Sequence, residues 1–226
     1  MGDNTSGPSR RNVLRGAVLL GVGVAAGGGA LLSTGIAGAD VPVPDIADCD
    51  TWGARPPSED VTPVERNPDK IIVHHTESAN TDDTSQDAAY AIAREIQHWH
   101  MDENGWIDTG QHFTNSRGGF LMEGRHTSLK HLTDGKGMVQ GAHAPGQNDK
   151  AIGIENQGTY FTVEPPKALW DSLVKLCAYI CAQYGIKATE IYGHRDYTDT
   201  DCPGDVLYGK IPQLREEVQK VLDGTP

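Results

Sequence analysis

The sequence has few basic residues: 19 lysines and arginines stand against 31 aspartates and glutamates in 226 residues, which gives a formal net charge of −12. A chain with so little positive charge has no basic patch to neutralise phosphates, which argues against a nucleic-acid partner. It also lacks an internal repeat, and its length suits one domain better than two. A hydrophobic content of 37% and a charged content of 22% are typical of a soluble globular protein.

Residues 1–39 have the pattern of an export signal. Arg10 and Arg11 precede an uncharged run of Gly, Ala, Val and Leu that ends at Ala37-Gly38-Ala39, an A-x-A cleavage site. The paired arginines resemble a twin-arginine signal, although Val13 stands where that signal prefers Phe. We therefore expect cleavage, a secreted mature protein and no stable membrane insertion after cleavage. An uncleaved membrane anchor is the alternative.

The rest of the chain predicts one α/β domain over residues 71–226, with helices packed on a central sheet. Residues 40–70, rich in Pro and Asp, are expected to form an N-terminal wrap with little regular structure. The Gly-rich stretch 135–146 suits surface loops. Hydrophobic patterns predict strands at 70–76 and 151–156, a hairpin of 109–114 with 119–123, and helices at 85–101, 166–184 and from 202 to about 222.

Two imidazoles and one thiol are candidate metal ligands. One histidine of the pair His74-His75, together with His194 and Cys202, would supply three ligands and leave a fourth position open, which is the catalytic form of a zinc site. Side chains alternate along a strand, so only one of the adjacent histidines reaches a given face, and the alternation alone does not choose between them. A hydrogen-bonded core histidine and an unrelated buried cysteine are the structural alternatives.

Two further residues near these ligands have predicted properties. Pro203 suits the first position of a helix, which predicts Cys202 as its N-cap and a lowered pKa for the thiol. Glu155 lies on the face of its strand opposite Ile152 and Ile154. A carboxylate at the end of so apolar a strand would be partly desolvated, with a pKa raised toward the range of a proton shuttle. A salt-bridge partner is the alternative for Glu155.

The other cysteines predict a disulfide. Cys177 and Cys181 lie four residues apart on one predicted helix and point in parallel, which is a poor arrangement for a bond between them. Cys49 is the better partner for Cys177 or Cys181, and an exported protein keeps such a bond. Three buried thiols are the alternative.

Six short stretches of the sequence, in their order and spacing, resemble a known family. They are residues 52–55, 71–76, 124–125, 141–144, 152–155 and 193–204. Over residues 51–222 the chain resembles the zinc amidases that include peptidoglycan recognition proteins and bacterial and phage N-acetylmuramoyl-L-alanine amidases. The resemblance implies a single α/β domain with a central mixed sheet flanked by helices, a Zn²⁺ cofactor and peptidoglycan as the partner. The sequence does not give the oligomeric state, and we expect a monomer.

The resemblance also implies roles for single residues. It implies that His74, rather than His75, is the ligand that acts with His194 and Cys202. Thr200 falls where the family steadies the developing oxyanion, and Glu155 falls where the bacterial and phage branch has its catalytic carboxylate. The implied reaction is hydrolysis of the amide bond between N-acetylmuramic acid and L-alanine in peptidoglycan.

One position departs from the family pattern. Gln111, in Gly110-Gln111-His112-Phe113, stands where the recognition-protein branch has a tyrosine that contacts the attacking water. This change alone favours a peptidoglycan-binding module without catalysis, but Glu155 favours an enzyme that depends on a carboxylate, and we predict the enzyme. A zinc peptidase or other amidohydrolase is a second rival. The candidate substrate-binding residues are polar or aromatic: Arg125, His143, Trp106, Asn156 and Gln111.

Overall fold

The computed structural model describes residues 41–225, so the predicted signal peptide lies outside the described residues. A six-stranded sheet in the order β1-β5-β4-β7-β3-β8 forms the centre of the described part, beside a two-stranded β2-β6 sheet. The strands are β1 (Ile46–Ala47), β2 (Pro63–Val64), β3 (Lys70–His75), β4 (Phe113–Asn115), β5 (Leu121–Glu123), β6 (Met138–Val139), β7 (Ala151–Asn156) and β8 (Ile191–Gly193).

Parallel pairing dominates the middle of the main sheet. Strand β3 runs parallel to both β7 and β8, and β4 runs parallel to β7. Strands β4 and β5 pair antiparallel, as the predicted hairpin requires. The sheet is therefore mixed, which confirms the predicted fold class. Both predicted long strands are also confirmed.

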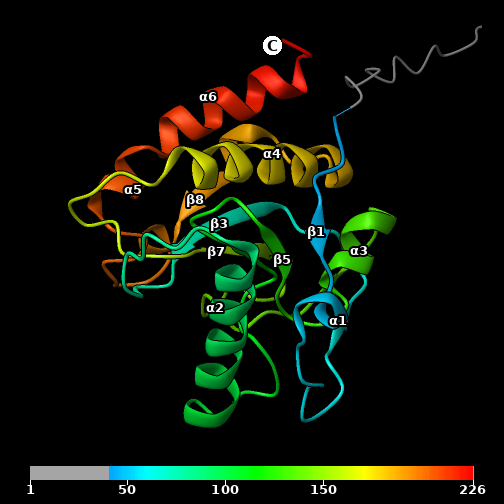
Figure 1. Cartoon of the computed structure of the whole chain (residues 1–226). Helices are drawn as coiled ribbons and strands as arrows, with labels where there is room; N and C mark the ends of the chain where they lie inside the picture. The colour runs from blue at the N-terminus through cyan, green and yellow to red at the C-terminus, as the bar shows by residue number, and fades with distance from the viewer. Residues whose placement is uncertain (1–40, 226) are drawn as a thin grey trace, which may run out of the picture. The chain divides into compact units, whose positions relative to one another are not determined.

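Helices cover the two faces of this sheet, with α4 and α6 on one side and α2 on the other (Figure 1). The helices are α1 (Cys49–Trp52), α2 (Gln86–His98), α3 (Ser128–Asp134), α4 (Lys167–Tyr184), α5 (Asp205–Gly209) and α6 (Ile211–Leu222). The alternation along β3 divides its side chains between the faces. Ile71 and Val73 belong to the large core shared with α4 and α6, whereas Ile72 packs on the opposite side with Ala144 and Ala151.

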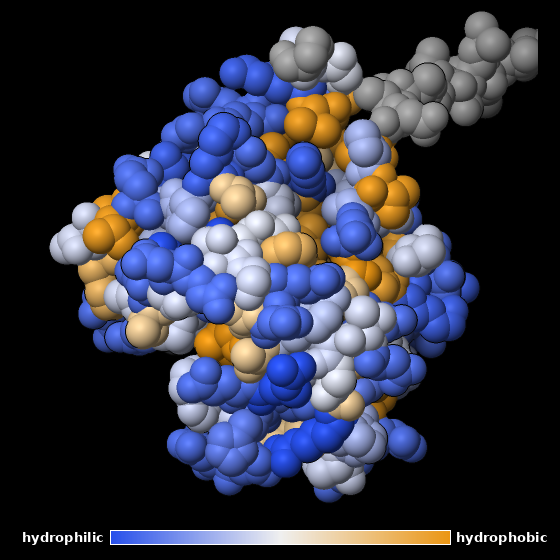
Figure 2. Space-filling view, viewed as in Figure 1, coloured by the Kyte–Doolittle hydropathy of each residue, from blue (hydrophilic) through white to orange (hydrophobic). Residues whose placement is uncertain are grey.

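The predicted helix over residues 166–184 is confirmed as α4. Pro166 precedes its first turn, and Gly185 ends it in the left-handed conformation with φ of 71°. Its central residue Leu173 is completely buried. Although α4 is apolar, none of the helices within residues 41–225 has both the length and the hydropathy needed to cross a membrane. The face shown in Figure 2 is mostly hydrophilic with small separate apolar patches.

Three local predictions were wrong in part. Helix α2 ends at His98 and continues as a π-helical turn, Trp99–Glu103, instead of running as one α-helix to residue 101. The Gly-rich stretch contains buried β6 rather than surface loops alone. The last helical segment does not begin at Pro203, because the amide of Gly204 donates to the carbonyl of Asp201 (2.7 Å) in a turn and α5 begins only at Asp205. Cys202 is therefore not a helix N-cap.

The predicted disulfide is not formed, and all four cysteines are free. Cys49 packs with Trp52 and Met122 against α2, whereas Cys177 and Cys181 lie in the core under α4. The central sheet separates these two clusters, so the alternative of buried thiols describes the three cysteines better. The Cys49 thiol instead contacts the carbonyl oxygen of Gly124 at 3.5 Å.

The packing of α4 predicts a large stability effect. We expect Leu173→Ala to lower the free energy of unfolding by about 2–5 kcal/mol, because the truncation leaves a cavity among buried side chains. Val43 is 73% exposed, so Val43→Ala should change it by less than about 0.5 kcal/mol. Denaturant titration in excess chelator measures both without a contribution from bound metal. Equal effects of the two substitutions would contradict this description of the core.

Candidate metal centre

Three donor side chains converge at one edge of the sheet. His74 lies near the end of β3, His194 directly follows β8, and Cys202 follows the next turn. Their donor atoms all lie within 4.8 Å of one another. Because β3 and β8 are parallel neighbours, their carboxyl ends meet at the same edge, which is where ligand sites form in such sheets. The amide of Arg195 donates to the carbonyl of Cys202 at 3.1 Å and so holds these two segments together.

The adjacent histidines point in different directions, as the strand alternation requires. The His74 ring belongs to the donor cluster, 4.4 Å from the His194 ring centre. The His75 ring instead accepts a hydrogen bond from the amide of Tyr160 (3.4 Å) and meets the edge of Phe161. The backbone amide of His75 does contact the cluster, because it donates to Sγ of Cys202 at 3.4 Å.

One imidazole of the cluster has a buried ring nitrogen without a partner. Nε2 of His194 is buried and has no hydrogen-bond partner among the described residues. A buried polar atom without a partner is rare and needs an explanation. Two imidazoles and one thiolate are a donor set that zinc accepts in tetrahedral sites, with the fourth position left for another group. The residues therefore fit a Zn²⁺ ion.

Burial sets the protonation states of the donors. Burial holds the pKa of His74 well below its usual range, and the neighbouring imidazoles lower it further. Burial also lowers the pKa of His194. Both rings are therefore neutral at pH 7, as ligation requires. Burial raises the pKa of the Cys202 thiol to about 12, although the hydrogen bond from the His75 amide acts to lower it. The lowered pKa predicted for this thiol was wrong for the metal-free protein, and metal binding would have to release its proton.

Glu155 and Thr200 face the same cleft as the donors. Glu155 pairs in register with His74 across β3 and β7, so the two side chains are neighbours on one face. Burial raises the pKa of Glu155 to about 8, and it has no ion-pair partner within residues 41–225. The Thr200 hydroxyl accepts a hydrogen bond from the amide of Cys202 at 3.2 Å, which leaves its hydrogen available to another acceptor.

The cleft has a volume of about 260 Å³ and one aromatic wall. Trp106 and His100 stack there with ring centres 4.7 Å apart and planes tilted by 30°. Trp106 was expected at the substrate, but His100 was not, because the π-helical turn that presents it has no clear sequence signal. Glu77 lies at the rim with φ of 54°, an uncommon backbone conformation for a residue other than glycine.

Three predicted substrate-binding residues do not line this cleft. Arg125 is buried and donates to the carbonyl oxygens of Thr109 (2.7 Å) and Gln140 (2.9 Å). Asn156 is buried and donates to the carbonyl of His74 at 2.9 Å. Gln111 is buried and donates to the Thr114 hydroxyl at 2.9 Å. All three side chains therefore lie behind the cleft, where they donate hydrogen bonds to other parts of the chain. His143 lines the cleft, but hydrogen bonds engage both of its ring nitrogens.

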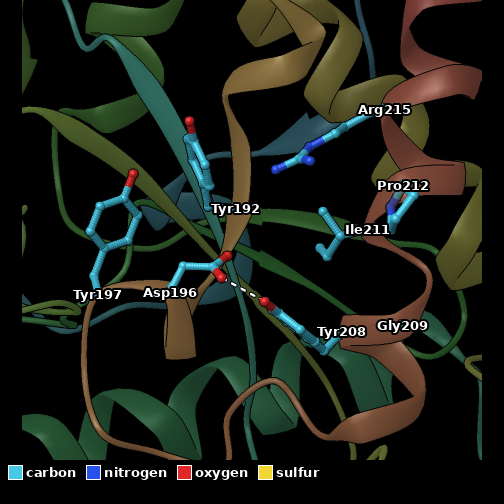
Figure 3. Close-up of a pocket in the computed structure, with 8 residues that line it drawn as sticks. All are labelled: Tyr192, Asp196, Tyr197, Tyr208, Gly209, Ile211, Pro212 and Arg215. Atoms are coloured by element: carbon cyan, nitrogen blue, oxygen red, sulfur yellow. Dashed lines mark hydrogen bonds between the residues drawn. The ribbon is translucent and has the colours of Figure 1, made fainter.

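A second pocket lies behind the turn that carries His194 (Figure 3). It has a volume of about 400 Å³ and is lined by Tyr192, Asp196, Tyr197, Tyr208, Gly209, Ile211, Pro212 and Arg215. Asp196 accepts a hydrogen bond from the Tyr208 hydroxyl (2.6 Å) and another from the amide of Gly193 (2.9 Å). These contacts fix the turn His194–Asp196 against α5 and so hold His194 at the cluster.

Comparisons with known proteins show the family of this chain. Residues 64–205 match the family Amidase_2, described as N-acetylmuramoyl-L-alanine amidase. The chain is 33% identical to peptidoglycan-recognition protein LB of Drosophila melanogaster over 161 residues, which are 71% of this chain and 64% of that protein. It is 28% identical to the N-acetylmuramoyl-L-alanine amidase of Sus scrofa over 71% of this chain and 25% of that protein. It therefore spans less than two thirds of the length of either relative.

Solved structures share the fold. The wild-type structure of Drosophila PGRP-LB matches with a TM-score of 0.65 and 32% identity, over 74% of this chain and 92% of that one. A Tyr-to-Phe variant of the same protein, in complex with tracheal cytotoxin, matches with a TM-score of 0.64. The fold and the donor cluster define an α/β protein with a candidate metal site at the edge of its sheet. The chain belongs to the N-acetylmuramoyl-L-alanine amidase family, Amidase_2.

The adjacent histidines provide a matched pair for testing the cluster. His74→Ala should weaken Zn²⁺ binding by more than about 100-fold, beyond the usual loss for residues that only contact ligands. His75→Ala should weaken it by less than about tenfold, because the donated amide of residue 75 remains. Competition with a chelator of known affinity measures both constants. A larger loss for His75→Ala than for His74→Ala would contradict the assignment.

Proposed function

We propose that this protein is a secreted, zinc-dependent N-acetylmuramoyl-L-alanine amidase that hydrolyses the amide bond between N-acetylmuramic acid and L-alanine in peptidoglycan. The observation that carries the proposal is the joint placement of Glu155 and Thr200 in the cleft that holds the His74, His194 and Cys202 donor atoms. Three ligands with a carboxylate and a hydroxyl beside them form a hydrolytic arrangement. Relatives named as peptidoglycan-recognition proteins and amidases support the substrate class.

The chemistry divides between the ion and the chain. When bound, zinc would lower the pKa of a water molecule and polarise the scissile carbonyl. The Glu155 carboxylate takes a proton from the attacking water and returns it to the departing amine of L-alanine. Its raised pKa suits this exchange, because a group that titrates near neutral pH both accepts and releases a proton readily. The Thr200 hydroxyl donates a hydrogen bond to the carbonyl oxygen as negative charge develops there.

The stacked rings of Trp106 and His100 form the wall against which the substrate would lie. The amide of Gly110 donates to Nδ1 of His100 at 3.1 Å and so orients this ring of the wall. Gly110 has no room for a side chain, because a Cβ there would lie 2.6 Å from the Trp106 ring. An open cleft with an aromatic wall suits an extended glycopeptide.

A binding module without catalysis is the second candidate, and Gln111 is the observation that favours it. Its side chain is buried away from the cleft, so it does not replace a tyrosine that contacts water. Glu155 supports catalysis in the absence of that tyrosine. Incubation of purified protein with cell walls, with and without chelator, separates the two. The enzyme releases new L-alanine amino termini only without chelator, whereas the binding module sediments with walls and releases none.

Export is proposed from the sequence pattern of residues 1–39. Fractionation of cells that produce the full chain, with mass spectrometry of the secreted product, tests it. A mature N-terminus near residue 40 outside the cytoplasm supports the proposal. A full-length chain retained in the cytoplasm would refute it.

Replacement of Glu155 by Gln should separate metal binding from turnover. Glu155→Gln keeps the shape of the side chain but cannot accept a proton, so we expect unchanged zinc stoichiometry and a fall in kcat of about 10²–10⁴-fold. Glu77→Gln, at the exposed rim, is the matched carboxylate control and should retain most of kcat. Full activity of Glu155→Gln in the release assay would remove Glu155 from the mechanism.

The Thr200 hydroxyl is tested by a pair of substitutions. Thr200→Val keeps the shape and removes the donor, which should lower kcat by about 10²–10³-fold. Thr200→Ser keeps both the donor and the acceptor for the Cys202 amide and should lie close to wild type. Zinc affinity is measured alongside, because a loss of affinity in Thr200→Val that accounts for the whole fall in kcat would contradict a role at the oxyanion.

A further inference from the structure

The second ring nitrogen of His74 has a specific partner. Nδ1 of His74 faces Sγ of Cys202 at 3.7 Å, on the side of the donor cluster, and Nε2 lies 3.0 Å from Nδ1 of His143. A neutral imidazole carries one hydrogen, and a nitrogen that binds a metal cannot carry it. If Nδ1 of His74 is the ligand, the hydrogen lies on Nε2. His143 must then accept it at Nδ1.

The other end of the His143 ring requires the same arrangement. Nε2 of His143 lies 3.2 Å from the carbonyl oxygen of Ala151. A carbonyl only accepts hydrogen bonds, so Nε2 of His143 carries the hydrogen and Nδ1 of this neutral, buried ring is the acceptor. The hydrogen bonds at the two ring nitrogens of His143 therefore require the same tautomers, and they form one continuous series. It runs from His74 through His143 to the backbone of β7.

The His143 ring sits in a space that two glycines leave open. A Cβ at Gly153 would lie 2.5 Å from Cγ of His143, and a Cβ at Gly141 would lie 2.7 Å from its Cδ2. Gly153 pairs with Ile72, which lies two residues before His74 and therefore on the same face of the sheet. The ring thus lies directly beneath the metal ligand, and neither glycine can be replaced without moving it.

Further contacts hold the His143 ring and the backbone that carries it. The His112 ring meets it edge to face, with centres 5.4 Å apart. His112 is itself fixed, because its Nε2 donates to the carbonyl of Val139 (2.8 Å) and its Nδ1 accepts from the amide of Gly153 (3.0 Å). The backbone of residues 143 and 144 is held by the Asn148 side chain, which accepts from both amides. The whole support is therefore made by side chains and backbone of the chain itself.

We propose that His143 is a positioning residue that fixes His74 in the Nε2–H tautomer and in the orientation that presents Nδ1 to the metal. Partners that orient a ligand histidine in this way contribute to metal affinity. His143 also lines the cleft, so its predicted contact with substrate stays a prediction beside this role. The inference rests on the proposed function only in that His74 binds a metal; the tautomers themselves are properties of the metal-free chain.

The tautomers are measured directly by ¹⁵N–¹H correlation spectra of the imidazoles in the metal-free, full-length protein. His74 and His143 should both appear as the Nε2–H form. A Nδ1–H form for either ring would overturn the proposal. Because no metal is present, this result stands apart from the proposed function, which would instead fail if the wild-type chain did not bind zinc.

The energetic role is tested by substitutions that keep or remove the acceptor. His143→Leu removes it at similar bulk and should weaken zinc binding by about 10–100-fold. His143→Asn keeps an amide oxygen near the place of Nδ1 and should recover most of that affinity. Circular dichroism of the metal-free variants shows whether each is folded. An affinity of folded His143→Leu within threefold of wild type, or no recovery in His143→Asn, would overturn the proposal.

A substitution that does not alter any histidine provides an independent test. Gly153→Ala should displace the His143 ring and weaken zinc binding in the same direction, by at least tenfold. Gly209→Ala is the matched control, because its Cβ would meet no atom within 4 Å, and it should bind zinc as wild type does. If His143→Leu does not fold, this pair and the wild-type tautomers decide the question. Equal affinities of the two glycine variants would contradict the proposal.

Discussion

The parallel pairing of β3 with β7 on one side and β8 on the other is the constraint on which the site depends. The register sets Glu155 beside His74, and it sets Gly193, the residue before His194, beside Val73. The pairing of these strands thereby brings three functional side chains, from segments far apart in the sequence, to one edge of the sheet, where the Asp196 contacts hold the turn of His194. A shift of one residue in either pairing would turn the site residues of that strand to the opposite face, which is filled by α4 and α6.

The same constraint separates packing from chemistry. One face of β3 and β7 contributes Ile71, Val73, Ile152 and Ile154 to the large apolar core. The other face contributes His74 and Glu155. It also contributes Gly153, which has no side chain and so leaves room for the His143 ring. Burial on this second face keeps the His74 imidazole neutral and raises the pKa of the Glu155 carboxyl to about 8. The centre is therefore prepared for a cation by the way in which the sheet is covered.

Much of this arrangement was predicted from the sequence, for identifiable reasons. The apolar strands, the hairpin and α4 follow from periodicity and from Gly185, and the His74, His194 and Cys202 cluster follows from residue types together with the family resemblance. The errors involve long-range geometry. The predicted disulfide of Cys49 was wrong because the sheet lies between Cys49 and the cysteines of α4. Arg125, Asn156 and Gln111 were predicted to line the cleft because they are polar, but polarity does not show which side chains form hydrogen bonds behind a cleft instead. His100 was missed because a π-helical turn has no periodic signature.

The central claim is that two imidazoles and one thiolate from this sheet edge hold a single zinc ion. X-ray absorption spectroscopy at the zinc edge of the zinc-loaded protein tests it most directly. The account predicts one ion per chain, with two nitrogen ligands at about 2.0–2.1 Å that show the multiple scattering of imidazole and one sulfur ligand at about 2.3 Å. A first coordination sphere without sulfur, or a protein that retains no stoichiometric zinc, would contradict it.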